Sequence, residues 1–238
     1  MPNWMALRTI LFDLDGTLAD TAPDLAYALN RLRREEGLEA LPLEPIRQRI
    51  SDGTPALIQL AFGVDDVAGP RFRQLRQRFL GIYEAHLARE TRLFPGMERV
   101  LDEIEERSLF WGVVTNKLEG LTSPLIKALG LSERAVCIVS GDTTANRKPH
   151  PEPLLHAARL SGSAPSQCLY VGDSQSDITA GREAGMMTLI ALYGYIDPAQ
   201  DTSRWGAHGS VSEPIEILSW LNVGEDTLPF RKKSQPHT

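Results

Sequence analysis

The stretch that decides the fold is Leu7-Arg8-Thr9-Ile10-Leu11-Phe12, followed directly by Asp13-Leu14-Asp15-Gly16-Thr17. The first six residues are rich in apolar side chains, which is typical of a buried strand. Ligands of open α/β sheets bind where strands end, so we expect both carboxylates in a functional site. Asp13 and Asp15 lie two apart on extended backbone and face the same way, so their repulsion requires a cation or a shared proton. A polar turn is the alternative that this stretch alone leaves open.

Three further apolar runs are followed by polar residues of the kinds that phosphate chemistry uses. The run 110–114 ends at Thr115-Asn116-Lys117, and the run 167–171 is followed by Gly172 to Asp177. Between them, a shorter run is followed by Arg147-Lys148-Pro149. Taken singly, the first triplet is also compatible with a strand-to-helix turn, and the lysine with a solvated loop residue. Their joint placement at strand ends favours a functional site.

In this order along the chain, the four motifs resemble those of the haloacid dehalogenase superfamily of phosphohydrolases. They are D-x-D-G-T at 13–17, the strand-end Thr115, Lys148 before a proline, and G-D-S-x-x-D at 172–177. Within the superfamily, bacterial phosphoglycolate phosphatases are similar over most of the chain from Leu7 to Trp205. Ser51-Asp52-Gly53 and the stretch from Tyr193 to Ala207 instead look like the N-acetylmuramic acid 6-phosphate phosphatases of peptidoglycan recycling.

The residue types also fit phosphoryl transfer through a carboxylate. This reaction needs a nucleophile in line with the leaving oxygen, neutralised phosphoryl oxygens and a proton for the departing alkoxide. The chain has no G-x-x-x-x-G-K motif for binding nucleotide phosphates and no H-E-x-x-H motif for a hydrolytic zinc site. Their absence argues against both of these kinds of site. A carboxylate can attack phosphorus to form an aspartyl phosphate, and several acids together suit Mg²⁺ as the cofactor.

The resemblance implies a role for each acid. Asp13 is the expected nucleophile and a metal ligand. Asp15 is the expected general acid and base, with its backbone carbonyl also on the metal. Asp173 completes the expected Mg²⁺ site. For Asp177, three roles stay open, namely a fourth metal ligand, a partner of Lys148 or an acid in the first turn of a helix, and we favour the partner of Lys148.

The resemblance also implies which residues hold the phosphoryl oxygens, namely Thr115, the backbone amide of Asn116, and Lys148. Other protein classes fit the pattern less well. A phosphorylated receiver domain would lack a long insertion after the nucleophile, and a dehalogenase would lack Asp15 because a halide leaves without a proton. A phosphosugar mutase would share both acids and stays an alternative.

Helical periodicity divides the chain into a core and an insertion. Apolar residues recur at helical spacing over 25–32 and 72–82, whereas helices and strands alternate from Leu93 onward. We therefore predict an α/β fold, with a doubly wound parallel sheet that carries an all-helical cap from about Thr17 to Thr91. The predicted units are 1–18 and 92–223 for the core, 19–91 for the cap and 224–238 for a flexible tail.

Specificity is expected in the cap, because the core contacts only the phosphoryl group. The candidate loop is Ser51, Asp52, Gly53 and Thr54, with Thr54 expected as the N-cap of a helix. Backbone amides there favour a carboxylate such as that of glycolate, whereas Asp52 opposes one and would accept hydrogen bonds from sugar hydroxyls. Overall resemblance ranks 2-phosphoglycolate first as substrate and N-acetylmuramic acid 6-phosphate second.

Composition limits the remaining classes. With 238 residues, 42% of them hydrophobic, the chain can bury one core plus an insertion, and its net charge of −6 argues against nucleic acid as a partner. No apolar stretch approaches the roughly 18 residues of a membrane span, so no membrane partner and a cytoplasmic location are expected. Cys137 and Cys168 are expected as buried free thiols. The expected partner is a small phosphate ester, bound by a monomer or a homodimer.

Overall fold

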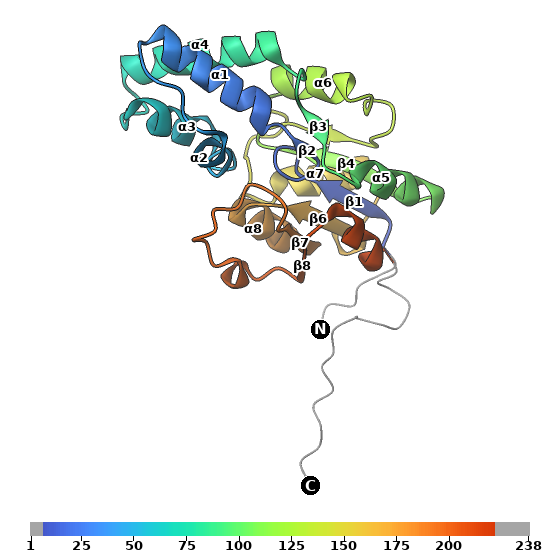
Figure 1. Ribbon diagram of the computed structural model, residues 1–238. Coiled ribbons are helices and arrows are strands. Elements are labelled where there is room, and N and C mark those ends of the chain that lie inside the picture. The colour runs from blue at the N-terminus through green and yellow to red at the C-terminus, as the bar shows by residue number, and fades with distance from the viewer. Residues whose placement is uncertain (1–6, 222–238) are drawn as a thin grey trace.

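The core of the molecule is a six-stranded sheet in the computed structural model, which describes residues 7–221 (Figure 1). Its strands are β1 (Thr9–Phe12), β4 (Phe110–Val114), β5 (Ile138–Val139), β6 (Cys168–Gly172), β7 (Met187–Ala191) and β8 (Gly209–Val211). Their order is β5-β4-β1-β6-β7-β8, and every neighbouring pair in this sheet is parallel. The predicted α/β fold is therefore confirmed, and β1 lies between two strands that come much later in the chain.

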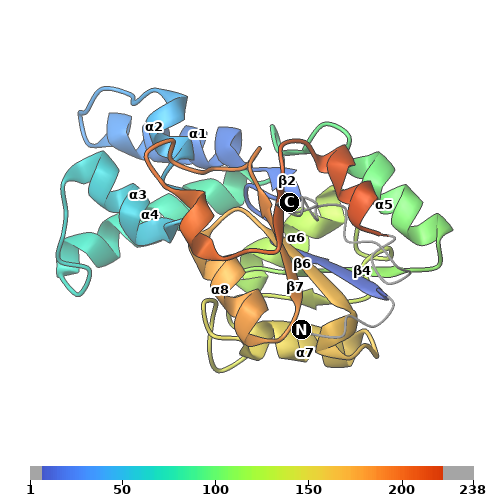
Figure 2. The same ribbon diagram turned by 90° about the horizontal axis from the view of Figure 1, so that it is seen from below.

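Helices cover both faces of this sheet, and Figure 2 shows them as two separate layers. The helices are α5 (Met97–Glu106), α6 (Glu119–Ala128), α7 (Glu152–Leu160) and α8 (Gln175–Glu183), with a 3₁₀ segment at Pro214–Trp220. Ile10 and Phe12 of β1 pack with α5, α6 and the 3₁₀ segment, whereas Leu11 packs with α7 and α8. This split follows from the strand itself, since successive side chains point to opposite faces.

The insertion after β1 forms a helical group beside the sheet in Figure 1. It contains α1 (Ala22–Glu35), α2 (Leu43–Arg47), α3 (Gly53–Phe62) and α4 (Pro70–His86). Apolar stripes of α1 and α4 at helical spacing are buried against each other, as their periodicity predicts. Two short strands, β2 (Ala19–Asp20) and β3 (Arg92–Leu93), pair antiparallel at its root.

The prediction of an all-helical insertion from about Thr17 is wrong at its start. The chain forms strand β2, paired with β3, before its first helix begins. Asp24, fully buried in α1, holds the far end of the insertion against its start. Its carboxylate accepts hydrogen bonds from the Thr91 hydroxyl at 2.7 Å and from the backbone N–H groups of Thr91 and Glu90. The prediction of Thr54 as an N-cap is also wrong: α3 begins at Gly53, whose φ of +82° suits glycine, and Asp52 precedes it.

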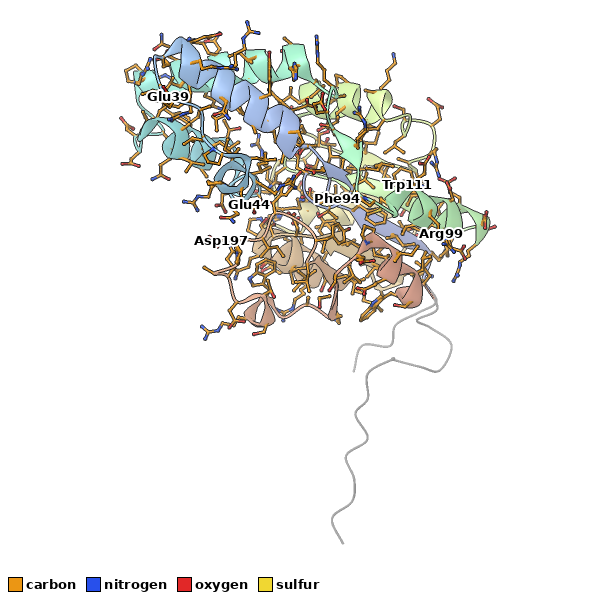
Figure 3. All side chains as sticks on the ribbon, viewed as in Figure 1. Glu39, Glu44, Phe94, Arg99, Trp111 and Asp197 are labelled. Carbon is orange, nitrogen blue, oxygen red and sulfur yellow. The ribbon has the colours of Figure 1, made fainter. Side chains whose placement is uncertain are left out.

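Phe94, labelled in Figure 3, lies where the helical insertion meets the sheet. Its ring packs edge-on against that of Tyr193, with 5.0 Å between the centroids. Cys137 and Cys168 are buried and free, as expected. No helix between residues 7 and 221 combines the length and the apolar character that a membrane span needs. The predicted tail at 224–238 lies outside the described residues.

Candidate active site

The order of the strands brings the predicted motifs to one edge of the sheet. Asp13 follows β1, Thr115 follows β4 and Asp173 follows β6, and these three strands are neighbours with β1 in the middle. The backbone N–H of Asp13 still donates to the carbonyl of Val171 at 2.9 Å, so the nucleophile candidate is fixed by the sheet. The carboxyl edge of a switch in strand order is the usual ligand site of such folds.

Lys148 forms the centre of the polar network. Its Nζ lies 2.8 Å from Oδ1 of Asp13, 2.7 Å from Oδ1 of Asp177 and 2.9 Å from the carbonyl oxygen of Val114. The hydroxyl of Tyr170 lies 2.7 Å away and also reaches Asp177. Burial opposes the charge of this lysine, but the carboxylates of Asp13 and Asp177 raise its pKa above the ordinary value. The ammonium is therefore charged and shared between two acids.

Asp13 and Asp177, which contact this ammonium, form a group of three carboxylates with Asp173. Oxygens of Asp13, Asp173 and Asp177 lie within 4.8 Å of one another. Burial raises the pKa of Asp13 to about 7 although Lys148 opposes the shift, and burial with the neighbouring acids raises the pKa of Asp173 well above its ordinary value. When all three acids are ionised, their charges outnumber the single ammonium of Lys148, and all the donors are oxygen. Such a set fits a hard divalent cation.

The oxygens of Asp177 are already used within the protein. Besides Lys148 and Tyr170 on Oδ1, the backbone N–H and the hydroxyl of Ser174 donate to Oδ2 at 3.0 and 2.6 Å. This arrangement supports the role that we favour from the sequence, a partner of Lys148 in the first turn of α8. The side chain of Asp15 is not part of the three-acid group, so its proposed place on the metal concerns its backbone carbonyl.

Two hydrogen bonds hold Asp173 by one of its carboxylate oxygens. Its Oδ2 accepts hydrogen bonds from the backbone N–H of Tyr195 at 2.8 Å and from the hydroxyl of Ser51 at 3.1 Å. A Cβ added at Gly194 would lie 2.4 Å from the Cβ of Asp173, so the chain can pass here only with glycine. The resemblance marked the stretch from Tyr193 to Tyr195 but gave it no function, and the structure shows that it positions Asp173.

Asp15 is oriented by Lys117, to which the sequence motifs assign no role. Nζ of Lys117 donates to Oδ1 of Asp15 at 2.8 Å, and the hydroxyl of Thr21 donates to the same oxygen at 2.6 Å. The ammonium also lies 4.7 Å from the ring centroid of Tyr83 in α4. Burial lowers the pKa of Lys117, but Asp15 outweighs that effect and the pKa is raised. The available signal was its place directly after the Thr115-Asn116 pair.

Thr115 and Asn116 lie in the same site, but their side chains make different contacts. The Thr115 side chain is buried at the end of β4, and its hydroxyl oxygen accepts the backbone N–H of Lys117 at 3.2 Å. The side chain of Asn116 spans two backbone groups of Lys148, donating to its carbonyl at 3.0 Å and accepting from its N–H at 3.1 Å. Asn116 thereby fastens the loop that carries the central lysine.

A cavity of about 400 Å³ lies between the core and the insertion. Its lining includes predicted core residues and the whole candidate cap loop: Asp13, Asp15, Thr115, Asn116, Lys148, Ser51, Asp52, Gly53 and Thr54. Asp173 instead lines an adjoining cavity, which it shares with Ser51 and Asp52.

Two features of the cap loop change its expected electrostatics. The carboxylate of Asp52 pairs with Arg49 at 3.1 Å, and the backbone N–H of Gly53 already donates to the carbonyl of Ile50. The charge of Asp52 is therefore partly offset. One of the backbone amides expected to bind a substrate carboxylate, that of Gly53, is already used within the loop.

Comparisons with known proteins agree with this geometry. The family described as haloacid dehalogenase-like hydrolase matches residues 10–191. A Pseudomonas putida protein named N-acetylmuramic acid 6-phosphate phosphatase is 42% identical over 213 residues, which cover 90% of this chain and 95% of the relative. A Xanthomonas campestris protein named phosphoglycolate phosphatase is also 42% identical, over 210 residues, which cover 88% and 94%.

A solved structure supports the same assignment. The crystal structure of a protein from Haemophilus somnus, described as a predicted phosphoglycolate phosphatase, superimposes with a TM-score of 0.81 at 27% identity and covers 91% of this chain and 98% of that one. The family match, the curated relatives and the solved structure thus all indicate the same family. The chain belongs to the haloacid dehalogenase-like hydrolases and is a phosphatase of that family.

Proposed function

We propose that the protein is a Mg²⁺-dependent phosphomonoesterase that acts through an aspartyl phosphate on Asp13. The observation that carries this proposal is the setting of Asp13: its carboxylate lies at a strand end, 2.8 Å from the Lys148 ammonium, beside the cavity that Asp15 also lines. The proposed nucleophile, the proposed general acid and the proposed phosphoryl-binding ammonium thus lie at one site. Phosphoryl transfer by a carboxylate needs these three groups.

Each group has a defined part in the proposed reaction. The carboxylate of Asp13 attacks phosphorus, the bond to the ester oxygen breaks, and Asp15 gives its proton to the departing alkoxide. In the second displacement Asp15 takes a proton from water, the water oxygen attacks phosphorus, and inorganic phosphate leaves with Asp13 restored. Lys148, Thr115 and the backbone amide of Asn116 hold the phosphoryl oxygens throughout, and Lys148 keeps Asp13 oriented.

The metal would bind at Asp13, Asp173 and the backbone carbonyl of Asp15. When bound, Mg²⁺ supplies positive charge that neutralises the phosphoryl oxygens. The fit rests on three acids whose oxygens lie within 4.8 Å of one another, while the ammonium of Lys148 is hydrogen-bonded to two of them, Asp13 and Asp177. Ser51 and Tyr195 fix Asp173 for this purpose, since both donate to one of its oxygens.

The names of the relatives suggest two candidate substrates, and the size of the cavity indicates which of the two to test first. Relatives of equal identity are named for 2-phosphoglycolate and for N-acetylmuramic acid 6-phosphate. 2-Phosphoglycolate, which overall resemblance ranks first, would occupy a small part of a cavity of about 400 Å³, whereas the sugar phosphate would fill much more of it. We therefore test N-acetylmuramic acid 6-phosphate first and 2-phosphoglycolate second, with selection by the loop at 51–54.

Phosphate release by the purified full chain tests the proposed function. We expect release from at least one of these two esters in the presence of Mg²⁺, with kcat/KM well above that for p-nitrophenyl phosphate. The Asp13→Asn variant keeps the size of the side chain but removes the attacking charge, so its activity should fall by several orders of magnitude. Turnover near the wild-type rate in a folded Asp13→Asn variant would rule out the proposed nucleophile.

A further inference from the structure

One face of α4 forms a wall of the cavity. Arg76, Phe79, Leu80 and Tyr83 line it, at the i, i+3, i+4 and i+7 spacing of a single helix face. The middle of this face is apolar and each end carries a polar group. The Tyr83 end lies beside the catalytic groups, because its ring is in contact with the ammonium of Lys117.

Among residues 7–221 the Tyr83 hydroxyl makes no hydrogen bond, although the Lys117 ammonium lies near enough to affect its pKa. The Tyr83 side chain is 1% exposed, and its oxygen is the one buried side-chain N or O atom between residues 7 and 221 that makes no hydrogen bond. Burial raises the pKa of Tyr83 to about 12 although the Lys117 ammonium opposes the shift, so the hydroxyl carries its proton at neutral pH and can donate it. Buried polar groups are nearly always satisfied, and a polar ligand in this cavity would satisfy this one.

Arg76 is exceptional among the arginines of α4. Arg71 and Arg78 pair with glutamates of the insertion, and Arg73 donates to the carbonyl of Ala68. Within the described part of the chain, the guanidinium of Arg76 has neither an ion pair nor a hydrogen bond, although this residue is the arginine of α4 that lines the cavity. Its charge is therefore available to a bound anion.

The two polar ends are well separated. Tyr83 follows Arg76 by seven positions along the helix, which corresponds to about 10 Å at 1.5 Å per residue. Helical side chains lean toward the N-terminus, so the Arg76 side chain points further from the site of chemistry. An anion bound there must be joined to the phosphoryl group by a spacer of several bonds.

We propose that this face of α4 is an elongated subsite, in which Tyr83 donates to an uncharged oxygen in the body of the substrate and Arg76 binds a carboxylate at its far end. This inference rests on the proposed function. A guanidinium matches a carboxylate with two parallel hydrogen bonds. The carboxylate of 2-phosphoglycolate is a single carbon away from the ester oxygen and cannot span the distance, whereas a carboxylated sugar phosphate can.

A matched pair of sugar phosphates tests the subsite. N-acetylmuramic acid 6-phosphate and N-acetylglucosamine 6-phosphate differ in the carboxylated ether that only the first one carries. We expect the wild type to prefer the first in kcat/KM, and Arg76→Gln to reduce that preference by roughly 10- to 100-fold, mainly through KM. Arg73→Gln, on the same helix but outside the cavity, should leave the preference unchanged.

A second variant, Tyr83→Phe, tests the other end of the subsite. It should lower kcat/KM for both sugar phosphates by the same factor, because the hydroxyl contacts the part that they share. Equal losses on the two sugars in Arg76→Gln, or an equal loss on 2-phosphoglycolate, would overturn the subsite while leaving the phosphatase intact. If the wild type releases phosphate from no ester at all, the proposed function fails and the subsite fails with it.

Discussion

The ammonium of Lys117 lies 2.8 Å from a carboxylate oxygen of Asp15, and the two side chains are 7% and 17% exposed. The same ammonium lies against the ring of Tyr83, which belongs to the helical insertion. Three residues far apart in the chain therefore meet at the proposed general acid. Lys117 both orients that acid and connects it to the helix that lines the cavity.

Replacement of Lys117 by Gln should slow turnover. The variant removes the ammonium that orients Asp15 and leaves a partly buried carboxylate without its ion pair. We expect kcat on an alkyl phosphate to fall by roughly 10- to 100-fold, with a smaller change in KM. Steady-state kinetics in Mg²⁺ give both constants, and Lys127→Gln, an exposed change on α6, is the control. A kcat equal to the wild-type value would show that Lys117 does not position the acid.

The Asp15→Asn variant separates the acid from the nucleophile. Its effect should depend on the leaving group, because an alkoxide needs a proton whereas p-nitrophenolate leaves without one. The loss of kcat should therefore be larger for an alkyl phosphate than for p-nitrophenyl phosphate, when both rates are measured with the same enzyme preparation. Loss by the same factor on both substrates would refute the role of general acid.

The metal requirement can be tested through Asp173. Removal of this side chain takes away a proposed ligand, so the Mg²⁺ concentration for half-maximal activity should rise by more than about 10-fold in Asp173→Ala. A chelator should abolish wild-type activity, and added Mg²⁺ should restore it. The prediction fails if titration of chelated enzyme gives the same half-maximal concentration for both proteins.

A pH effect on stability is expected at His208. The backbone N–H of Thr188 donates to its Nδ1 at 3.1 Å, so this nitrogen is an acceptor and unprotonated. Burial, and then the charge of Arg182, lower the pKa of His208 in the folded protein. The group therefore favours folding above about pH 6.5, and this contribution is lost as the pH falls through the lowered value.

His208→Asn keeps an acceptor but cannot be protonated. The melting temperature of the wild type, measured relative to that of the variant, should therefore fall between pH 7.5 and pH 5. His150→Asn, in an exposed turn, provides the control. A difference in melting temperature that stays constant over this range would show that His208 does not titrate in the way that its contacts imply.

Much of the core site follows from the sequence for a simple physical reason. Asp13, Thr115 and Asp173 each close an apolar strand, and the carboxyl ends of neighbouring parallel strands must meet. Strands β2 and β3 have two residues each, too few to show the alternation of a strand in the sequence. The sequence therefore predicts a helix where the chain first forms this antiparallel pair.

The contacts between the insertion and the core could not be predicted in the same way. The place of Tyr83 beside Lys117, and of Ser51 beside Asp173, depends on how the helical group packs over the strand ends. Periodicity identifies the buried face of α4 but does not reveal that part of this face borders a cavity. Both contacts join residues widely separated in the chain, and only the folded arrangement shows them.

The most direct test of the central claim is a search for the phosphoryl group on Asp13. The Asp15→Asn variant should slow the attack of water, so the phosphoenzyme should accumulate during turnover of p-nitrophenyl phosphate with Mg²⁺. Acid quenching followed by peptide mass spectrometry would then locate the modification. We predict one added phosphoryl group on Asp13 that hydroxylamine removes, and none in Asp13→Asn. Continued phosphate release with Asp13 unmodified, or a phosphoryl group on another residue, would contradict the account.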